Sequence, residues 1–471
     1  MTTTFTDSYI RKLNEDIAVF PQVTPIKPDF HITRKGVSQL VMLDRYAFKD
    51  IEKRTLSEGD FVIVKVNDDP KFPALVLGFI TKLDRKHNRA TIALDEDFLG
   101  TNGLTEEEAK TGVVVRPLEL IEKPLEIFYE QIADRVARGL AAVETDEAKR
   151  EQAHADFYRE IVSDNFVPAG RILYGAGSGN EVTFFNCFVM PYPKDSREGI
   201  AEHRGKVMEI MARGGGVGTN GSTLRPRLAL ARGVGGKSSG SVSWLNDIAQ
   251  LTHLVEQGGS RRGAQMILLA CWHPDIIEFI ISKMQNPRIL RYLTENFADP
   301  EIKRLAKAKL KFKPLSDDDR EIYEQALLRL DPGSTAYKKA QEKLADGGTY
   351  EVVNPDFLTG ANISVAITAD FMEAVEDDVK YELRFPDVES YNAEEMAYYN
   401  EHWHECGDVR EWPLAIKTYR TVKARELWQL ICFCATYSAE PGIFFIDNAN
   451  DKTNAKAYGQ KVVATNPCGM H

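Results

Sequence analysis

The chain contains 471 residues, of which 43% are hydrophobic and 27% are charged, and its formal net charge is −11. This composition is typical of a globular protein with a large apolar core, and the length suggests about two to four domains. The acidic balance argues against a protein that coats nucleic acid or a membrane surface, and no stretch approaches the ~20 apolar residues needed to cross a bilayer. Six irregularly spaced cysteines and the lack of a signal-like N-terminus indicate a reducing, cytoplasmic compartment.

Residues 1–112 are predicted to form a small β-rich domain. Short β-branched runs at residues 61–66, 74–80 and 91–94 are separated by turn signals, a spacing typical of a small barrel or sheet. Residues 37–46 are interpreted as a further part of this β-rich region.

The pattern becomes helical over residues 113–165, where apolar residues recur on one helical face from Phe128 onward. Residues 166–471 are rich in glycine and mix helical and strand patterns, which predicts a larger α/β domain. A charged helical insertion is expected at about residues 287–350, and it is interpreted as a solvated excursion without chemistry. Its three helices are predicted to start at Asp299-Pro300, at Ser316 and at Ser334.

Two glycine motifs partly match nucleotide-binding patterns. Residues 216–221 match G-x-G-x-x-G, but a dinucleotide fingerprint needs a strand before it and a helix after it. A helical pattern precedes this motif and Pro226 follows it, so a dehydrogenase is a weak alternative. Residues 235–238 resemble the end of a P-loop, but position 231 is alanine where the motif needs glycine. The glycine-rich backbone beside Lys237 still favours an anion-binding turn.

The cysteines and histidines fall into different classes. His402, His404 and Cys406 lie on one side of a segment predicted to be extended, but no fourth zinc ligand is evident nearby, so an exposed polar segment is favoured. Cys432 and Cys434 lie in an apolar helical run and are interpreted as packing residues.

Cys187 and Cys468 do not fit a packing role. Cys187 interrupts a strand-like run, and Cys468 lies in a turn marked by Asn466-Pro467 and a following glycine. No Asp/His pair accompanies either cysteine as hydrolysis would require, so radical or redox thiol chemistry is favoured.

At these residues the sequence resembles the catalytic subunit of the adenosylcobalamin-dependent ribonucleotide reductases. The similarity runs in family order from about residue 115 to residue 471. Its blocks are residues 166–177, Asn186-Cys187, 214–218, Leu224-Arg225-Pro226, 258–264, 273–280, 359–365, 440–443 and Asn466-Pro467-Cys468-Gly469. Many blocks in one order are far more specific than a single glycine motif.

The resemblance implies an α/β fold, a ten-stranded barrel made of two half-barrels with a central finger loop, and residues 166–471 would form its first half. It assigns Cys468, at the loop tip, as the thiyl radical that abstracts the ribose 3′-hydrogen. Cys187 matches the first cysteine of the pair that reduces the 2′-carbon, and Asn466 matches an asparagine that hydrogen-bonds the ribose. Three further positions match substrate-contacting residues: Gly170, Asn186 and Gly216.

The resemblance also implies regulation and partners. Asp195 and Arg225 match residues that bind a deoxynucleoside triphosphate effector, and a guanidinium suits phosphate recognition. A homodimer, adenosylcobalamin, a ribonucleotide substrate with diphosphates favoured, and a thioredoxin-like or other dithiol reductant are expected. No nucleic acid or membrane partner is expected.

One position departs from the family pattern. The family has a glutamate two residues after the radical cysteine, where this chain has Met470, and a thioether cannot act as a general base. With the second reducing cysteine also lacking, the chain is expected to be a fragment that needs a complementary C-terminal chain. The alternative is a nucleotide-binding regulatory or scaffold protein that has lost catalysis.

Overall fold

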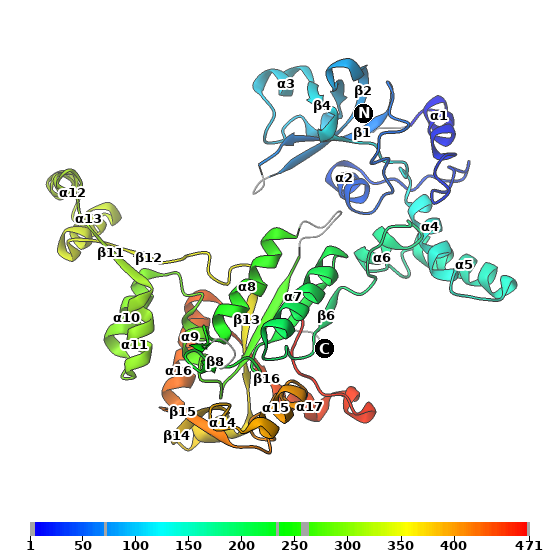
Figure 1. The fold of residues 1–471 in the computed structure, drawn as a ribbon. Helices are drawn as coiled ribbons and strands as arrows, with labels where there is room; N and C mark the ends of the chain where they lie inside the picture. Colours follow the sequence, from blue (N-terminus) through cyan, green and yellow to red (C-terminus); the bar gives the residue numbers. More distant parts are fainter. Residues whose placement is uncertain (1–4, 70–72, 232–234, 256–262, 469–471) are drawn as a thin grey trace. The chain divides into compact units, whose positions relative to one another are not determined.

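The computed structural model describes residues 5–69, 73–231, 235–255 and 263–468 (Figure 1). The chain divides into two compact units, one ending at Asn186 and the other formed by the described residues from Cys187 onward. Among the described residues, no helix is both long enough and apolar enough to span a bilayer.

The first unit contains a five-stranded antiparallel sheet with the order β4-β3-β2-β1-β5. Its strands are β1 (Phe61–Asn67), β2 (Ala74–Asp84), β3 (Arg89–Leu94), β4 (Val113–Pro117) and β5 (Ile121–Glu122). The three predicted β runs lie in β1, β2 and β3. The sheet continues past residue 112, because β4 and β5 belong to it.

Helices complete the first unit. They are α1 (Asp7–Ile17), α2 (Gly36–Arg45), α3 (Glu106–Thr111), α4 (Tyr129–Ala141), α5 (Glu147–Val162) and α6 (Gly170–Gly175). The β interpretation of residues 37–46 is wrong, since they fall almost entirely in α2. Gln39, Met42 and Leu43 are its buried residues, a spacing that fits one face of a helix and not one face of a strand.

The second unit is built on a five-stranded, all-parallel sheet with the order β16-β13-β10-β7-β6. The strands are β6 (Cys187–Val189), β7 (Gly216–Asn220), β10 (Gln265–Ala270), β13 (Asn362–Ile367) and β16 (Gly442–Phe445). Every residue of the central strand β10 is buried. Parallel strands connected by helices form the α/β architecture predicted for half of a barrel.

Helices follow the strands in turn. They are α7 (Arg197–Ala212), α8 (Ser241–Leu254), α9 (Ile276–Ile281), α14 (Ala369–Glu376), α16 (Ala424–Ser438) and α17 (Ile446–Lys452). Helix α7 packs on β7, while α8 and α9 pack on β10. The main core of the unit gathers the apolar residues of β10, β13, α9 and α16.

Two excursions leave this sheet. The charged insertion contains α10 (Pro287–Asn296), α11 (Pro300–Ala308), β11 (Leu310–Pro314), α12 (Asp317–Arg329), α13 (Thr335–Asp346) and β12 (Gly348–Val352). The side chains of Asp299, Ser316 and Ser334 cap its helices at the predicted starts. The antiparallel β11–β12 ribbon within it was not predicted.

The second excursion contains β14 (Lys380–Pro386), α15 (Ala393–Cys406) and β15 (Ile416–Lys423). The predicted extended conformation of residues 402–406 is wrong, because they form the last turns of α15, which Gly407 ends in a left-handed conformation. Within the described part of the chain, no three His, Cys, Asp or Glu side chains group in a way that could hold a metal ion.

A fully buried arginine holds the first unit together. The Arg135 guanidinium on α4 donates to both carboxylate oxygens of Glu126, over 2.7 and 3.0 Å. It also donates to the backbone carbonyls of Tyr46, Leu173 and Ala176, and therefore ties α2 and α6 to α4. A buried charge is tolerated only when it is paired and hydrogen-bonded in this way.

We expect Arg135→Met to lower the free energy of unfolding of the first unit by about 3–5 kcal/mol, because Glu126 would remain buried without its counter-ion. Urea unfolding followed by hydrogen exchange of α4 peptides measures this effect. Arg138→Met is the matched control, since Arg138 lies on the same helix with a side chain 46% exposed. Equal effects of the two substitutions would contradict the role given to Arg135.

Candidate functional site

Two cysteines far apart in the sequence meet at the sheet of the second unit. Cys187 is the first residue of β6, and Cys468 is an exposed residue of the segment that follows the short helix η5 (Asn454–Tyr458). Their sulfur atoms are 3.9 Å apart, compared with about 2.05 Å in a disulfide. Two thiols at this separation can both reach one small substrate.

The glycines of β7 make room for this arrangement. Successive residues of a strand point to opposite faces, so Gly216 and Gly218 share one face. A Cβ at Gly216 would lie 3.1 Å from both Cys187 Sγ and Pro467 Cγ, and one at Gly218 would lie 2.1 Å from the Thr465 carbonyl oxygen. The segment of residues 463–468, called here the cysteine loop, therefore crosses β7 in direct contact with its backbone. This contact explains the glycine motif, which is a strand and not a dinucleotide-binding turn.

Asn220, the third residue on that face of β7, anchors the cysteine loop. Its side-chain amide donates to the Val463 carbonyl over 2.7 Å. Its amide oxygen accepts from the Ser222 hydroxyl, which in turn accepts from the backbone N–H of Ala270 in β10. Asn220 and Ser222 are buried, so the loop is tied to two strands through a shielded network. Sequence reasoning missed Asn220, although its position two residues after Gly218 placed it on the loop face.

The opposite face of β7 is covered by α7. The buried His203 on α7 lies 3.0 Å from the Thr219 hydroxyl. Burial lowers the pKa of His203 to about 4, so its imidazole is neutral at physiological pH. A buried, neutral imidazole beside a hydroxyl fits a packing role for this face.

The remaining predicted substrate positions lie in different units. Asn466 is half-buried in the cysteine loop, with its Cα 3.3 Å from the position of a Cβ on Gly218. Asn186 is exposed and directly precedes Cys187, at the end of the first unit. Gly170 begins α6 in the first unit, where a Cβ would lie 3.1 Å from the ring of Tyr46. The structure thus gathers Cys187, Gly216, Asn466 and Cys468. Met470 lies outside the described residues.

The predicted effector residues form an ion pair at a second place in the same unit. The Arg225 backbone N–H and Nε donate to the Asp195 carboxylate over 3.0 and 2.7 Å, and its Nη1 donates to the Leu230 carbonyl. The buried Tyr399 hydroxyl donates to the same carboxylate over 2.7 Å. Burial lowers the pKa of Arg225, but Asp195 and Tyr399 more than offset this effect, so the pKa is raised.

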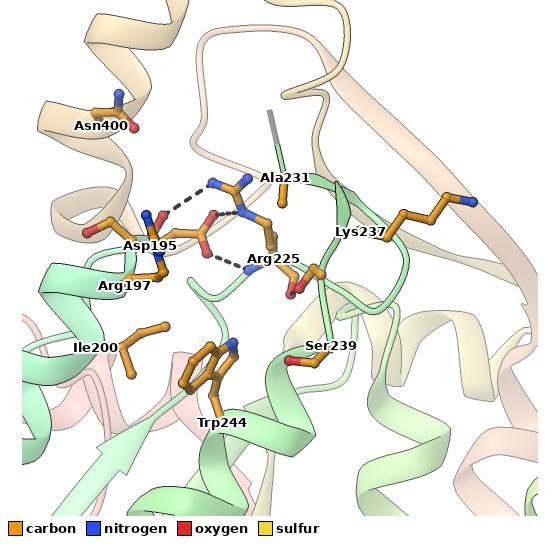
Figure 2. Close-up of a pocket in the computed structure, with 11 residues that line it drawn as sticks. Asp195, Arg197, Ile200, Arg225, Ala231, Lys237, Ser239, Trp244 and Asn400 are labelled. Atoms are coloured by element: carbon orange, nitrogen blue, oxygen red, sulfur yellow. Dashed lines mark hydrogen bonds and ion pairs between the residues drawn. The ribbon is translucent and has the colours of Figure 1, made fainter. Parts of the chain in front are cut away.

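A cavity of about 390 Å³ opens beside this ion pair (Figure 2). Three cationic side chains line it, Arg197 at the start of α7, Arg225 and Lys237, together with the hydroxyl-bearing Ser196, Ser238 and Ser239. The turn around Lys237, predicted to bind an anion, is thus part of this wall. Ile200 and Trp244 form the apolar part. We call this space the cationic lobe, and its chemistry suits a polyphosphate.

A buried carboxylate positions the loop that carries Arg225 and Lys237. Asp275 accepts from the backbone N–H groups of Arg227 and of Ser241, the first residue of α8. Burial raises the pKa of Asp275 to about 6. The adjacent His273 accepts from the Asp275 N–H and lies 2.9 Å from the Leu224 carbonyl, and burial lowers its pKa to about 4.

Comparison with known proteins agrees with the resemblance. Residues 185–469 match a family model described as "Ribonucleotide reductase, barrel domain", and residues 120–181 match one described as "Ribonucleotide reductase, all-alpha domain". A "Vitamin B12-dependent ribonucleoside-diphosphate reductase" of Thermoplasma acidophilum is 27% identical over 66% of the chain, and one of Mycobacterium tuberculosis is 25% identical over 72%. A "Ribonucleoside-diphosphate reductase large chain" of Cryptosporidium parvum is 24% identical over 67%.

The alignments cover only part of these relatives. They span 28% of the Thermoplasma protein, 35% of the Mycobacterium protein and 31% of the Cryptosporidium protein. The matched part of the chain therefore corresponds to about a third of the length of these three relatives.

The glycine at position 218 is expected to control how close the two cysteines come. A methyl group in Gly218→Ala would overlap the Thr465 carbonyl and displace the cysteine loop. Formation of a Cys187–Cys468 cross-link by added diamide, followed by mass spectrometry of unreduced peptides, should slow by on the order of 10²-fold. Gly205→Ala is the control, because a Cβ there meets nothing within 4 Å. An unchanged rate in Gly218→Ala would show that the loop does not depend on this contact.

His273 and Asp275 are expected to affect the pH dependence of stability in opposite directions. The pKa of His273 falls from 6.5 to about 4 on folding, so the unfolded chain binds the extra proton and the free energy of unfolding rises with pH in this window. The pKa of Asp275 rises from 3.8 to about 6, so the free energy of unfolding falls with pH over nearly the same window.

Each substitution should therefore leave only the pH dependence of unfolding that the other residue causes. As the pH rises from 4 to 6, the free energy of unfolding of Asp275→Asn should increase by about 3 kcal/mol relative to that of the wild type. The free energy of unfolding of His273→Gln should decrease by about the same amount relative to the wild type. Urea unfolding at several pH values, followed by tryptophan fluorescence, measures both slopes. Parallel slopes in the two variants would contradict the pKa shifts.

Proposed function

Because this chain belongs to the ribonucleotide reductase family, we propose that its cysteine-bearing sheet takes part in the reduction of ribonucleotides to 2′-deoxyribonucleotides. The observation that carries the proposal is the 3.9 Å contact of the Cys187 and Cys468 sulfurs beside the glycine face of β7. Diphosphate substrates are favoured, since two of the relatives are named B12-dependent ribonucleoside-diphosphate reductases.

The two cysteines have separate roles in this proposal. Cys468, as a thiyl radical, abstracts the ribose 3′-hydrogen and returns it to C3′ at the end of the reaction, which restores the thiyl radical. Its exposure leaves it accessible to the group that generates the radical. The C2′–O bond then breaks and the oxygen leaves as water. Cys187 and a second cysteine supply two electrons and two protons and end as a disulfide, which a thioredoxin-like or other dithiol reduces. Asn466, beside Cys468, hydrogen-bonds the ribose.

Adenosylcobalamin is the proposed cofactor, in keeping with the names of the relatives. When bound, it supplies the radical chemistry, while the protein supplies position and shielding. The exposed Cys468 thiol fits this role, since it is held on an anchored loop and is not packed in the core.

The remaining parts of the site are assigned to sequence outside these 471 residues. The described residues form one parallel five-stranded sheet, and the family barrel implied by the resemblance has ten strands. The other strands, a general base and the second reducing cysteine would come from elsewhere in the same polypeptide or from a complementary C-terminal chain.

The cationic lobe is proposed to bind a deoxynucleoside triphosphate effector. Arg197, Arg225 and Lys237 offer three positive charges, and Asp195 can accept from a sugar hydroxyl. Binding in a homodimer follows from the family resemblance.

The function is tested with the chain assembled with the remaining barrel strands, adenosylcobalamin, dithiothreitol and a ribonucleoside diphosphate. We expect the deoxynucleotide product to form and Cys468→Ser to abolish it, because serine does not form the required radical. Cys432→Ser is the control, since that thiol lies half-buried in α16 and burial raises its pKa. Turnover by Cys468→Ser would refute the assignment, and effector binding without turnover would favour the regulatory alternative.

A further inference from the structure

The residue that leads into the cysteine loop is held by a second asparagine, in addition to Asn220. This asparagine lies on the short helix α17, which directly follows the edge strand β16 (Figure 1). The side-chain amide of Asn450 on α17 accepts from the Val462 backbone N–H over 2.8 Å and donates to the Val462 carbonyl over 2.9 Å. One side chain thus pairs both polar backbone groups of one residue, as an adjacent strand would do.

Side chains hold this part of the chain because it has no regular structure of its own. Residues 460–468 lie in no helix or strand, so no ladder of backbone hydrogen bonds fixes them. Val462 is bound by Asn450, and the next carbonyl, that of Val463, is bound by Asn220 at the end of β7. Consecutive Cα atoms are only ~3.8 Å apart. The chain is therefore held at two adjacent residues, once from α17 and once from β7.

Helix α17 can hold the chain because it is itself fixed. The Arg410 guanidinium donates to both carboxylate oxygens of Asp447, the second residue of α17, over 2.7 and 2.8 Å. The same carboxylate accepts from the backbone N–H of Ala369 at the start of α14. The Asn450 amide also donates to the Ile446 carbonyl of its own helix over 3.1 Å, which limits the rotation of its side chain. The carboxamide is therefore presented to the cysteine loop from a fixed position.

The position of Val462 affects the thiol at the end of the loop. Cys468 follows it by six positions, a segment that spans at most about 22 Å when fully extended, so a change of direction at Val462 is carried to the thiol. We propose that Asn450 is a positioning residue that keeps Cys468 within reach of Cys187 and of the substrate. It acts through the cysteine loop and not by contact with the substrate. This inference rests on the proposed reduction of ribonucleotides, to which it adds a residue of α17.

The test measures how fast diamide links Cys187 to Cys468 in the full chain, relative to how fast iodoacetamide alkylates Cys468. Asn450→Ala should slow the cross-link by on the order of tenfold, because the released peptide lets the thiol leave its position. The alkylation rate should stay unchanged, since alkylation needs an exposed thiol but no partner at a fixed distance. Asn448→Ala is the matched control, because Asn448 is exposed on the same helix.

A second variant, Asn450→Asp, separates the hydrogen bonds from the shape of the side chain. A carboxylate has nearly the same size and can still accept from the Val462 N–H, but it cannot donate to the Val462 carbonyl. Asn450→Asp should therefore slow the cross-link as Asn450→Ala does. In the assembly used to test turnover, both variants should lower kcat and leave the KM for the ribonucleoside diphosphate nearly unchanged.

The outcomes separate this inference from the function on which it rests. A wild-type cross-linking rate in either variant would overturn the inference alone. An equal slowing of cross-linking and alkylation would overturn it as well, because it would show a general loss of structure. A slowed cross-link in both variants, together with no turnover by the assembled wild-type protein, would support the positioning of the two thiols and overturn the proposed function.

Discussion

The contact between the Thr465 carbonyl and the Gly218 backbone is the constraint on which the candidate site depends. A Cβ at position 218 would lie 2.1 Å from that oxygen, so only glycine lets the cysteine loop rest on β7. The same approach brings Pro467 against Gly216 and Cys468 near Cys187. Asn220 then fixes the loop through the Val463 carbonyl. The two glycines of β7 thus form the floor of the site.

The two predicted sites, the cysteine pair and the cationic lobe, are both positioned by the paired strands β6 and β7. Strand β6 carries Cys187, and the chain that leaves this strand reaches Asp195 before α7 begins. Strand β7 carries the glycine floor, and the chain that leaves it reaches Arg225. The pairing of β6 with β7 therefore sets the position of the thiols at one end and of the cationic lobe beyond the other. Asp275 and His273 hold the second end through backbone hydrogen bonds.

Much of this arrangement could be predicted from the sequence, because the signals were local or came in ordered blocks. Helix caps such as Asp299 and Ser316 act within one turn and were found. The prediction for residues 37–46 was wrong because the apolar run was interpreted as strand, whereas its buried residues Gln39, Met42 and Leu43 follow a helical spacing. Residues 402–406 misled because alternation of His402 and His404 reads as a strand, whereas Trp403 and Tyr399 are the buried pair one helical turn apart. The role of Asn220 depends on a partner 243 positions away, which no local pattern reveals.

The ion pair between Arg225 and Asp195 has a consequence for how the cationic lobe responds to its surroundings. The Arg225 guanidinium already donates to the Asp195 carboxylate and to the Leu230 carbonyl. An anion that binds there would therefore compete with Asp195 for the guanidinium. If the lobe binds an anion as proposed, a multiply charged group would have an advantage over a monoanion, because it would offer several contacts in exchange for the one with Asp195. A ligand of this lobe would therefore have to bind the Arg225 guanidinium more favourably than the Asp195 carboxylate does.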